Sequence, residues 1–416
     1  MRTARVWPVL LGVEHTVIEK VELRQENGEE VLVASVRPTR SRRSRCSRCG
    51  RRARGYDRGE GRRRWRALDL GSTRTYLQAD SPRVSCPVHG VVVAAVPWAR
   101  AGARHTHAFE DTCAWLAANA ALSTVAELLR CTWRTVSAIV VRVVADRAGE
   151  TDRLAGLTRI GIDEISYRKG HRYLLAVVDH DTGRLVWAAP GRDQATLRAF
   201  FDALGPERAA LLTHVSADGA QWIHDVVAER APQAVLCIDA FHVVAWATKA
   251  VDEVRRNLVG DLRRAGGKDA AAELKGTRWA LLKNPGDLTG EQRTTLAWIA
   301  TTNRGLYRAY LLKEQLREAF RVKGRRGRLL LAGWLAWARR SRLPAFVKLA
   351  KTIARYLPPI HNTFDHGLSN ARSEATNTHL RLLTRRAYGY HSPDALIAMA
   401  MLTRGGLCPE LPGRTA

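Results

Sequence analysis

Several features are scarce or missing in this sequence of 416 residues. No apolar run is long enough to span a membrane, no secretory signal is recognisable, and no internal repeat is visible. The seven cysteines lack the dense pattern of a disulfide-stabilised secreted protein. Acidic residues are few, since 40 Asp and Glu face 67 Lys and Arg and leave a formal net charge of +27. These absences exclude a membrane-spanning or disulfide-scaffold protein and predict a cytoplasmic chain that binds a polyanion.

Domain boundaries follow from shifts in composition along the chain. The length and a hydrophobic content of 46% allow two to four domains with real cores. The stretch 246–360 is basic and helical and lacks an acidic constellation of its own, so it is either a DNA-contacting insertion or a plain structural bundle. We expect an N-terminal β element with a zinc-binding, DNA-binding module (1–100), a helix-turn-helix (105–150), an α/β core in two parts (155–245 and 361–416) and a helical insertion (246–360).

Five predicted strands define the α/β core. Ile160 and Ile162 alternate with small or polar residues, which indicates a strand leading into Asp163. The Asp and Gly within residues 180–183 supply the turn of a following β-hairpin. Helical segments separate the later strands, and the resulting order β-β-β-α-β-α-β is typical of a ribonuclease-H-like fold. The strands are expected near residues 157–163, 173–179, 184–189, 209–216 and 234–239.

Asp163, Asp218 and Glu374 are the candidate catalytic residues. Asp163 closes the first predicted strand, Asp218 follows the fourth, and Glu374 lies far downstream on a predicted helix. Carboxylate oxygens suit Mg²⁺ or Mn²⁺, and two such ions about 3.5–4 Å apart can stabilise both the entering and the leaving oxygen of a phosphodiester. Clustered acids would repel DNA unless metal ions intervened. We therefore predict a two-metal nuclease site.

Asp239 and His242 are neighbours of this site whose roles stay open. Asp239 also follows a strand, so it competes with Asp218 for the second metal position. His242 comes three residues later at a strand-to-helix junction, where it could hydrogen-bond Asp239, contact DNA or have a purely structural role. Glu164 would point to the opposite face of the sheet if the strand continued, so it is a lesser candidate.

The helix that carries Glu374 presents further polar groups. Ser369 or Asn370 can cap its N-terminus. Asn377 lies one turn after Glu374 on the same face, near the predicted active site and the DNA backbone. An exposed basic helix with an incidental glutamate is the alternative. The basic residues of this helix expected to contact DNA are Arg381, Arg385 and Arg386.

Cys46, Cys49, Cys86 and His89 form a CxxC and CxxH pattern. Two closely spaced pairs of thiolate and imidazole ligands match the needs of tetrahedral Zn²⁺. A disulfide is the alternative, but the cytosolic style of cysteine use disfavours it. The remaining cysteines resemble scattered small apolar residues. We predict a structural zinc site.

Two segments before the core are predicted to bind DNA. Fourteen arginines occur from Arg37 to Arg66, and such a surface attracts phosphates with little regard to base sequence. Farther along, two apolar-periodic helices flank a turn at residues 131–133, the pattern of a helix-turn-helix. Its second helix would present Arg134 and Thr135 to the major groove.

Taken together, these motifs resemble insertion-sequence transposases of the DDE type, in particular the bacterial ISL3 family, over nearly the whole chain. The resemblance implies that the three acids belong to a ribonuclease-H-like core interrupted by a helical insertion. The markers are Ile162-Asp163-Glu164 with Tyr167-Arg-Lys-Gly-His171, Ser216-Ala-Asp218, Asp239-Ala-Phe-His242 and Ser369-Asn-Ala-Arg-Ser-Glu374-Ala-Thr-Asn377.

The resemblance also implies partners and a reaction. The expected partner is double-stranded DNA, both the terminal inverted repeats of a mobile element and a target, and the expected reaction is Mg²⁺-dependent cleavage and strand transfer. Assembly as a homo-oligomer at the bacterial nucleoid is expected because two DNA ends are handled together. A DNA-binding regulator with a non-catalytic core, and a ribonuclease-H-like nuclease selective for branched DNA, are the alternatives.

Overall fold

A computed structural model describes residues 6–168, 170, 172–368, 371–387, 389–390 and 392–413. The chain divides into two compact units, Met1–Asp152 with Leu383–Ala416, and Arg153–Leu382. The sequence-based C-terminal domain, 361–416, spans the division at Leu383. In the part of the chain that the structure describes, no helix is long and apolar enough to cross a bilayer. The motif residues Lys169, His171, Ser369 and Asn370, the last two being the predicted helix cap, lie outside the described residues.

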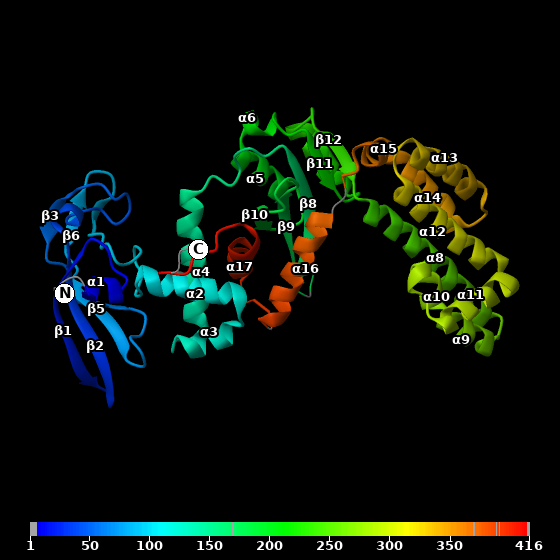
Figure 1. Cartoon of the computed structure of the whole chain (residues 1–416). Coiled ribbons are helices and arrows are strands. Elements are labelled where there is room, and N and C mark those ends of the chain that lie inside the picture. The colour runs from blue at the N-terminus through cyan, green and yellow to red at the C-terminus, as the bar shows by residue number, and fades with distance from the viewer. Residues whose placement is uncertain are drawn as a thin grey trace. The chain divides into compact units, whose positions relative to one another are not determined.

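The first unit opens with a four-stranded sheet of order β1-β2-β5-β4 (Figure 1). Asn27 and Gly28 join β1 to β2 with φ angles of 52° and 81°, as a two-residue Asn-Gly hairpin loop requires. Trp65 and Trp98 pack edge to face beneath the sheet with ring centroids 5.4 Å apart. The elements are α1 (Val6–Leu10), β1 (Thr16–Glu26), β2 (Glu29–Pro38), η2 (Arg40–Arg42), β4 (Arg62–Arg66) and β5 (Arg74–Asp80).

A small sheet and a group of helices complete the first unit. The small sheet has the order β3-β6-β7. Helix α4 buries Val136, Ile139 and Val143 against α2, α3 and α17, so the predicted helix-turn-helix has the expected apolar face (Figure 1). The elements are β3 (Arg54–Asp57), β6 (Arg83–Cys86), β7 (Gly90–Val93), α2 (His107–Asn119), α3 (Leu122–Leu128), α4 (Trp133–Glu150) and α17 (Pro393–Arg404).

The second unit contains a five-stranded sheet of order β10-β9-β8-β11-β12. The first three strands are antiparallel neighbours, while β11 runs parallel to both β8 and β12. Helices α5 and α7 cover the sheet, and their Phe200 and Ile223 are buried with Ile162 of β8. The elements are β8 (Arg159–Arg168), β9 (Arg172–Asp179), β10 (Leu185–Pro190), α5 (Gln194–Leu204), α6 (Pro206–Ala209), β11 (His214–Ala217), α7 (Gln221–Arg230) and β12 (Val235–Ile238).

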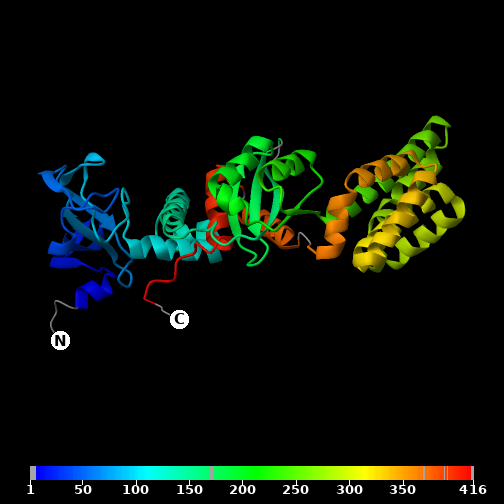
Figure 2. The same cartoon turned by 90° about the horizontal axis from the view of Figure 1, so that it is seen from above.

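A helical bundle is inserted between β12 and α16 (Figure 2). Its core buries Trp334 and Phe346 and is continuous with Val243 at the start of α8. The chain returns through α15, where Asn362 Nδ2 and Thr363 Oγ1 donate hydrogen bonds to main-chain oxygens of the edge strand β12. The inserted helices are α8 (Ala240–Arg264), α9 (Lys268–Gly276), α10 (Arg278–Leu282), η3 (Pro285–Asp287), α11 (Gly290–Thr302), α12 (Arg304–Val322), α13 (Gly324–Arg340), α14 (Pro344–Arg355) and α15 (Leu357–His366). The chain then continues into α16 (Ala371–Arg386).

Candidate functional site

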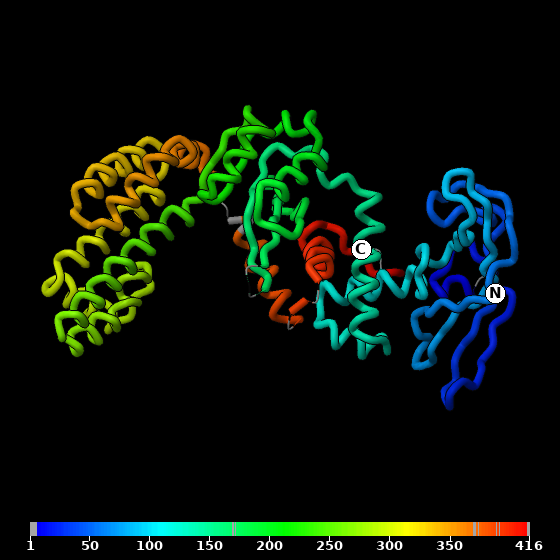
Figure 3. Tube along the Cα trace, turned by 180° about the vertical axis from the view of Figure 1, so that it is seen from behind, coloured from blue at the N-terminus to red at the C-terminus, as the bar shows by residue number. Residues whose placement is uncertain are grey.

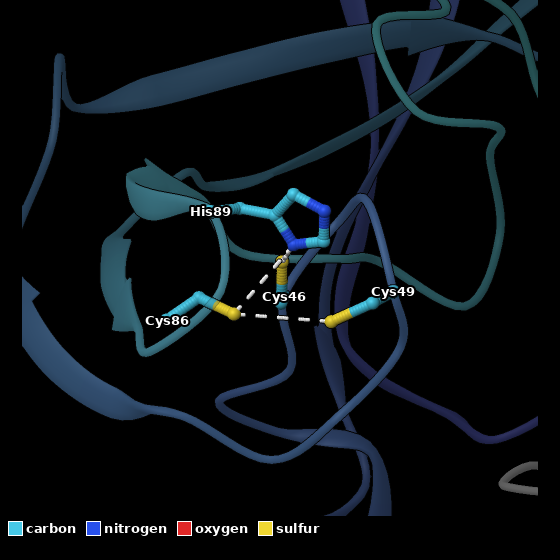
Figure 4. Close-up of side chains that lie close together, drawn as sticks. All are labelled: Cys46, Cys49, Cys86 and His89. Carbon is cyan, nitrogen blue, oxygen red and sulfur yellow. Dashed lines mark hydrogen bonds between the residues drawn. The ribbon is translucent and has the colours of Figure 1, made fainter.

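Cys46, Cys49, Cys86 and His89 converge in the small sheet of the first unit (Figure 4). Cys86 ends β6 and His89 lies in the turn to β7, while the other pair lies in the loop before β3. One potential ligand atom from each residue lies within 4.8 Å of all the others. His89 Nδ1 is 3.6 Å from Cys46 Sγ and 3.7 Å from Cys86 Sγ, and Cys49 Sγ is 3.8 Å from Cys86 Sγ.

These spacings fit a zinc ion. A tetrahedral centre with Zn–S bonds of about 2.3 Å separates neighbouring sulfur atoms by about 3.8 Å. The 3.8 Å distance between Cys49 and Cys86 is far from that of a disulfide, and all four residues face one point. The main-chain N–H of Arg48 also points at Cys46 Sγ, over 3.4 Å, which favours the thiolate that zinc requires. The donor set therefore fits the predicted structural zinc, and the disulfide alternative is wrong.

Asp163 lies in the middle of β8, which continues to Arg168 instead of ending at the acid as predicted. Its side chain is only 6% exposed. Oδ1 accepts a hydrogen bond from the Glu164 main-chain N–H over 2.7 Å, and Oδ2 accepts one from Asn377 Nδ2 over 2.6 Å. Burial raises the pKa of Asp163 to about 6, and the charge of Asp218 adds to the shift.

Asp163 on β8 is aligned with Asp218 and Asp239, which directly follow the neighbouring parallel strands β11 and β12. The ladders pair Gly161 with Ser216 and Ala217 with Ile238. Asp163 and Asp218 each lie two residues after the Gly161–Ser216 pair, so they are neighbours across β8 and β11. Asp218 and Asp239 each lie one residue after the Ala217–Ile238 pair, so Asp218 lies between the other two aspartates. This register explains why the charge of Asp218 contributes to the raised pKa of Asp163.

Each of the other two aspartates helps to start a helix. Asp218 Oδ1 accepts a hydrogen bond from the Ala220 main-chain N–H over 2.9 Å, just before α7. Asp239 is buried and caps α8, with its Oδ1 accepting from the Phe241 main-chain N–H over 3.2 Å. His242 Nδ1 lies 3.4 Å from Asp239 Oδ2, so one of the open interpretations of His242, contact with Asp239, has a geometric basis.

Helix α16 brings the distant acid to the same region, beside β8 (Figure 3). Glu374 is half-buried in its first turn. Burial, and then the charge of Asp239, raises the pKa of Glu374, while His242 opposes the shift. Asn377, one turn on, is 8% exposed and holds Asp163, so it faces the acid and not the solvent. Among the described residues, the carboxylates do not form a tight metal-ligand cluster like that of the cysteines and His89.

Glu164, the lesser candidate of the sequence analysis, follows Asp163 on β8. Its carboxylate forms an ion pair with Arg192, whose guanidinium lies 4.8 Å over the Tyr173 ring. Burial and the charge of Asp218 raise the pKa of Glu164 to about 7 despite Arg192. The charge of Asp218 therefore reaches Glu164 and favours the protonated form of its carboxyl.

The predicted DNA-contacting residues are found in different settings. Arg134 is exposed at the start of α4 with its guanidinium 5.5 Å over the Trp133 ring. Thr135 is partly covered, and its main-chain N–H donates to the Thr132 side chain that caps the helix. Arg386 donates to the main-chain oxygen of Ala117, at the C-terminal end of α2. Two further residues of α16, Arg381 and Arg385, are exposed.

A zinc-ribbon cluster, a helix-turn-helix and an acid-bearing α/β core in one strongly basic chain define the class of a DNA transposase. Known families match these parts in the same order. The zinc finger of the IS204/IS1001/IS1096/IS1165 transposases matches residues 42–89, the helix-turn-helix domain of transposase family ISL3 matches residues 94–144, and the ISL3 transposase domain matches residues 160–400.

Individual relatives agree with this assignment. The transposase for insertion sequence element IS1557 of Mycobacterium tuberculosis, from strains CDC 1551 / Oshkosh and H37Rv, is 55% identical over 436 aligned residues, with 100% of this chain and 98% of the relative covered. The transposase for IS1001 of Bordetella parapertussis is 28% identical, with 80% and 82% covered. The chain belongs to the ISL3 family of transposases, and the resemblance read from its motifs is confirmed.

Proposed function

We propose that this transposase binds the terminal inverted repeats of its insertion sequence and catalyses Mg²⁺-dependent DNA cleavage and strand transfer with Asp163, Asp218 and Glu374. The observation that carries the proposal is the alignment of Asp163 on β8 with Asp218 and Asp239, which directly follow β11 and β12, together with the hydrogen bond from Asn377 of α16 to Asp163. The strand order β10-β9-β8-β11-β12, with the first three strands antiparallel, supports a ribonuclease-H-like core.

The chemistry of the donor set fits two magnesium ions. Mg²⁺ prefers carboxylate oxygens, and when bound it would supply charge stabilisation at both the attacking and the leaving oxygen. Burial raises the pKa of Asp163, and the buried Asn377 Oδ1 accepts no hydrogen bond from a described residue, so a bound cation would stabilise both groups. Asp218 is the preferred second ligand because it lies between the other two aspartates. Asp239, engaged with the α8 N-terminus and His242, is the competitor.

The first unit would supply DNA affinity. Exposed arginines of the zinc ribbon such as Arg48, Arg51 and Arg54 would bind phosphates and make affinity strongly salt-dependent. Arg134 on α4 would read base edges. Two copies or more would act together on the two element ends, in the cytoplasm at the nucleoid.

A cleavage assay tests the proposal. The full-length chain is incubated with Mg²⁺ and a labelled duplex that carries one end of its element. We expect nicking at the end, followed by joined products, and a loss of both in Asp163→Asn and Glu374→Gln. Asp225→Ala is the matched control, because Asp225 is an exposed acid on α7 that bonds the Gln221 side chain.

Further outcomes separate the alternatives. Tight end binding without cleavage would favour a DNA-binding regulator, and cutting of branched DNA without joining would favour a structure-selective nuclease. Comparing Asp218→Ala with Asp239→Ala decides which aspartate is the second ligand, because loss of the ligand abolishes cleavage while loss of a supporting residue only slows it.

A further inference from the structure

Phe241 is exposed beside the proposed active site. Six of the seven phenylalanines of the chain are at most 6% exposed, whereas Phe241 is 62% exposed. The residue lies in the first turn of α8, between Asp239 and His242. Other large apolar side chains, such as Leu211 and Trp279, are also exposed singly, so Phe241 is distinguished by its place between Asp239 and His242 of the proposed site.

The backbone of Phe241 is anchored, and its ring does not belong to the core. The Phe241 main-chain N–H donates to Asp239 Oδ1, and the flanking Ile238 and Val243 are fully buried, so the backbone on both sides is anchored. The ring meets the His242 ring edge to face, with centroids 5.9 Å apart and planes at 66°. This contact uses little of the aromatic surface, and most of the Phe241 ring stays open to solvent.

The acidic residues beside Phe241 indicate which kind of molecule its ring would contact. The acids around Phe241 would receive metal ions and the phosphate of a DNA strand, so the groups that come next to the ring are nucleotides. An uncharged aromatic ring can stack on any base, because every base has a π face, and it neither competes for the metal ions nor repels the phosphate. Holding a nucleotide out of the duplex costs unstacking and unpairing energy, and this cost is lowest for a base that is already mismatched.

We propose that Phe241 stacks on the nucleobase next to the scissile phosphate and holds that nucleotide out of the duplex during cleavage. The proposal rests on the nuclease function proposed above. It makes Phe241 a positioning residue that contacts the DNA substrate and takes no part in proton transfer.

Cleavage rates with paired and mismatched ends test this role. Base stacking on an aromatic side chain is worth about 5- to 150-fold in binding, so Phe241→Ala should slow cleavage of a fully paired end by about tenfold or more. Phe241→Trp should restore the rate and Phe241→Leu should not. A mismatch at the pair next to the scissile phosphate should bring Phe241→Ala to within about threefold of the wild type, because that base is already unpaired.

Leu211→Ala is the matched control. Leu211 is 63% exposed and precedes β11, at the end of the strand opposite Asp218, so its loss should leave both substrates unaffected. Three results would each overturn the proposal: wild-type cleavage of the paired end by Phe241→Ala, restoration by leucine as good as by tryptophan, or a defect that the mismatch leaves unchanged.

Photocrosslinking gives a readout that is independent of cleavage. A duplex end with 5-iodouracil next to the cleavage position is irradiated with the full chain in Ca²⁺, whose coordination differs from that of Mg²⁺. Mass spectrometry should find the crosslink at residue 241. Crosslinks confined to other residues would refute the stacking. A crosslink at residue 241 from a chain that cleaves no end in Mg²⁺ would support the stacking while rejecting the nuclease function.

Discussion

Asn377 Nδ2 donates a hydrogen bond of 2.6 Å to Asp163 Oδ2, and this bond joins residues 214 positions apart in the sequence. It ties α16 to the central strand β8 and thereby brings Glu374, one helical turn earlier, toward the aspartates. It also stabilises the ionised form of Asp163, since the contact lowers the pKa of a carboxylate that burial raises. The same hydrogen bond therefore positions α16 and favours the negative charge of Asp163.

Removing this bond should weaken magnesium binding. Asn377→Ala leaves Asp163 without its side-chain donor, and loss of a residue that orients a ligand typically weakens metal affinity by about 10- to 100-fold. We expect half-maximal cleavage at a correspondingly higher Mg²⁺ concentration. The control is Thr378→Ala, an exposed neighbour on the same helix. An unchanged Mg²⁺ requirement in Asn377→Ala would contradict the assigned role.

The charge of Asp163 should destabilise the magnesium-free protein. The pKa of this carboxyl rises from its ordinary 3.8 to about 6, so the folded protein holds a proton that the unfolded chain releases between these values. The contribution of Asp163 to stability is thus greatest below pH 3.8, falls as the pH rises to about 6, and stays low above it. This difference between the pKa values of the folded and the unfolded chain corresponds to about 3 kcal/mol of stability.

Asp163→Asn should remove this cost. In zinc-loaded, magnesium-free protein at pH 7, we expect the variant to be more stable than the wild type by about 1–3 kcal/mol, with the difference shrinking toward pH 4. Hydrogen exchange of β8 and β11 amides during urea titration measures it locally. A difference that is equal at pH 4 and pH 7 would show that ionisation is not the cause.

Folding of the zinc ribbon should require zinc, whereas folding of the helices α2 to α4 should not. Cys49→Ser replaces one of the four ligands, so we expect zinc content to fall from one ion per chain toward none and the amides of residues 42–94 to lose protection. The helices α2 to α4 should keep theirs. Cys131→Ser, outside the cluster, should keep its zinc, and full zinc content in Cys49→Ser would reject this ligand set.

Substitution of two arginines should distinguish sequence-specific base contacts from nonspecific phosphate contacts. Arg134→Ala should weaken binding of the element end by about 1–3 kcal/mol while hardly affecting a scrambled duplex, because a base-edge contact is sequence-dependent. Arg51→Ala should weaken both duplexes alike and reduce the slope of log affinity against log salt by about one. Fluorescence anisotropy at several salt concentrations measures both effects. Equal losses on the two duplexes for Arg134→Ala would assign it to the backbone.

Much of this protein could be predicted from its sequence because the signals are local. Apolar runs mark the five core strands, and the 3.6-residue apolar period marks the helices α3 and α4, each of which buries one face. The cysteine and histidine spacing predicts the zinc cluster because each pair fits a single turn, and the structure brings both pairs together. The acidic motifs likewise identify the family.

Only the tertiary structure decided how the distant residues meet. Strand register aligned Asp163 with Asp218 and Asp239. The packing of α16 placed Asn377 against Asp163, although its position on the helix alone also allowed contact with DNA. Burial raised the pKa values of Asp163 and Glu164, and exposure singled out Phe241 among the phenylalanines. Register, burial and long-range contacts depend on which segments pack together in three dimensions, and local sequence patterns carry no direct information about that.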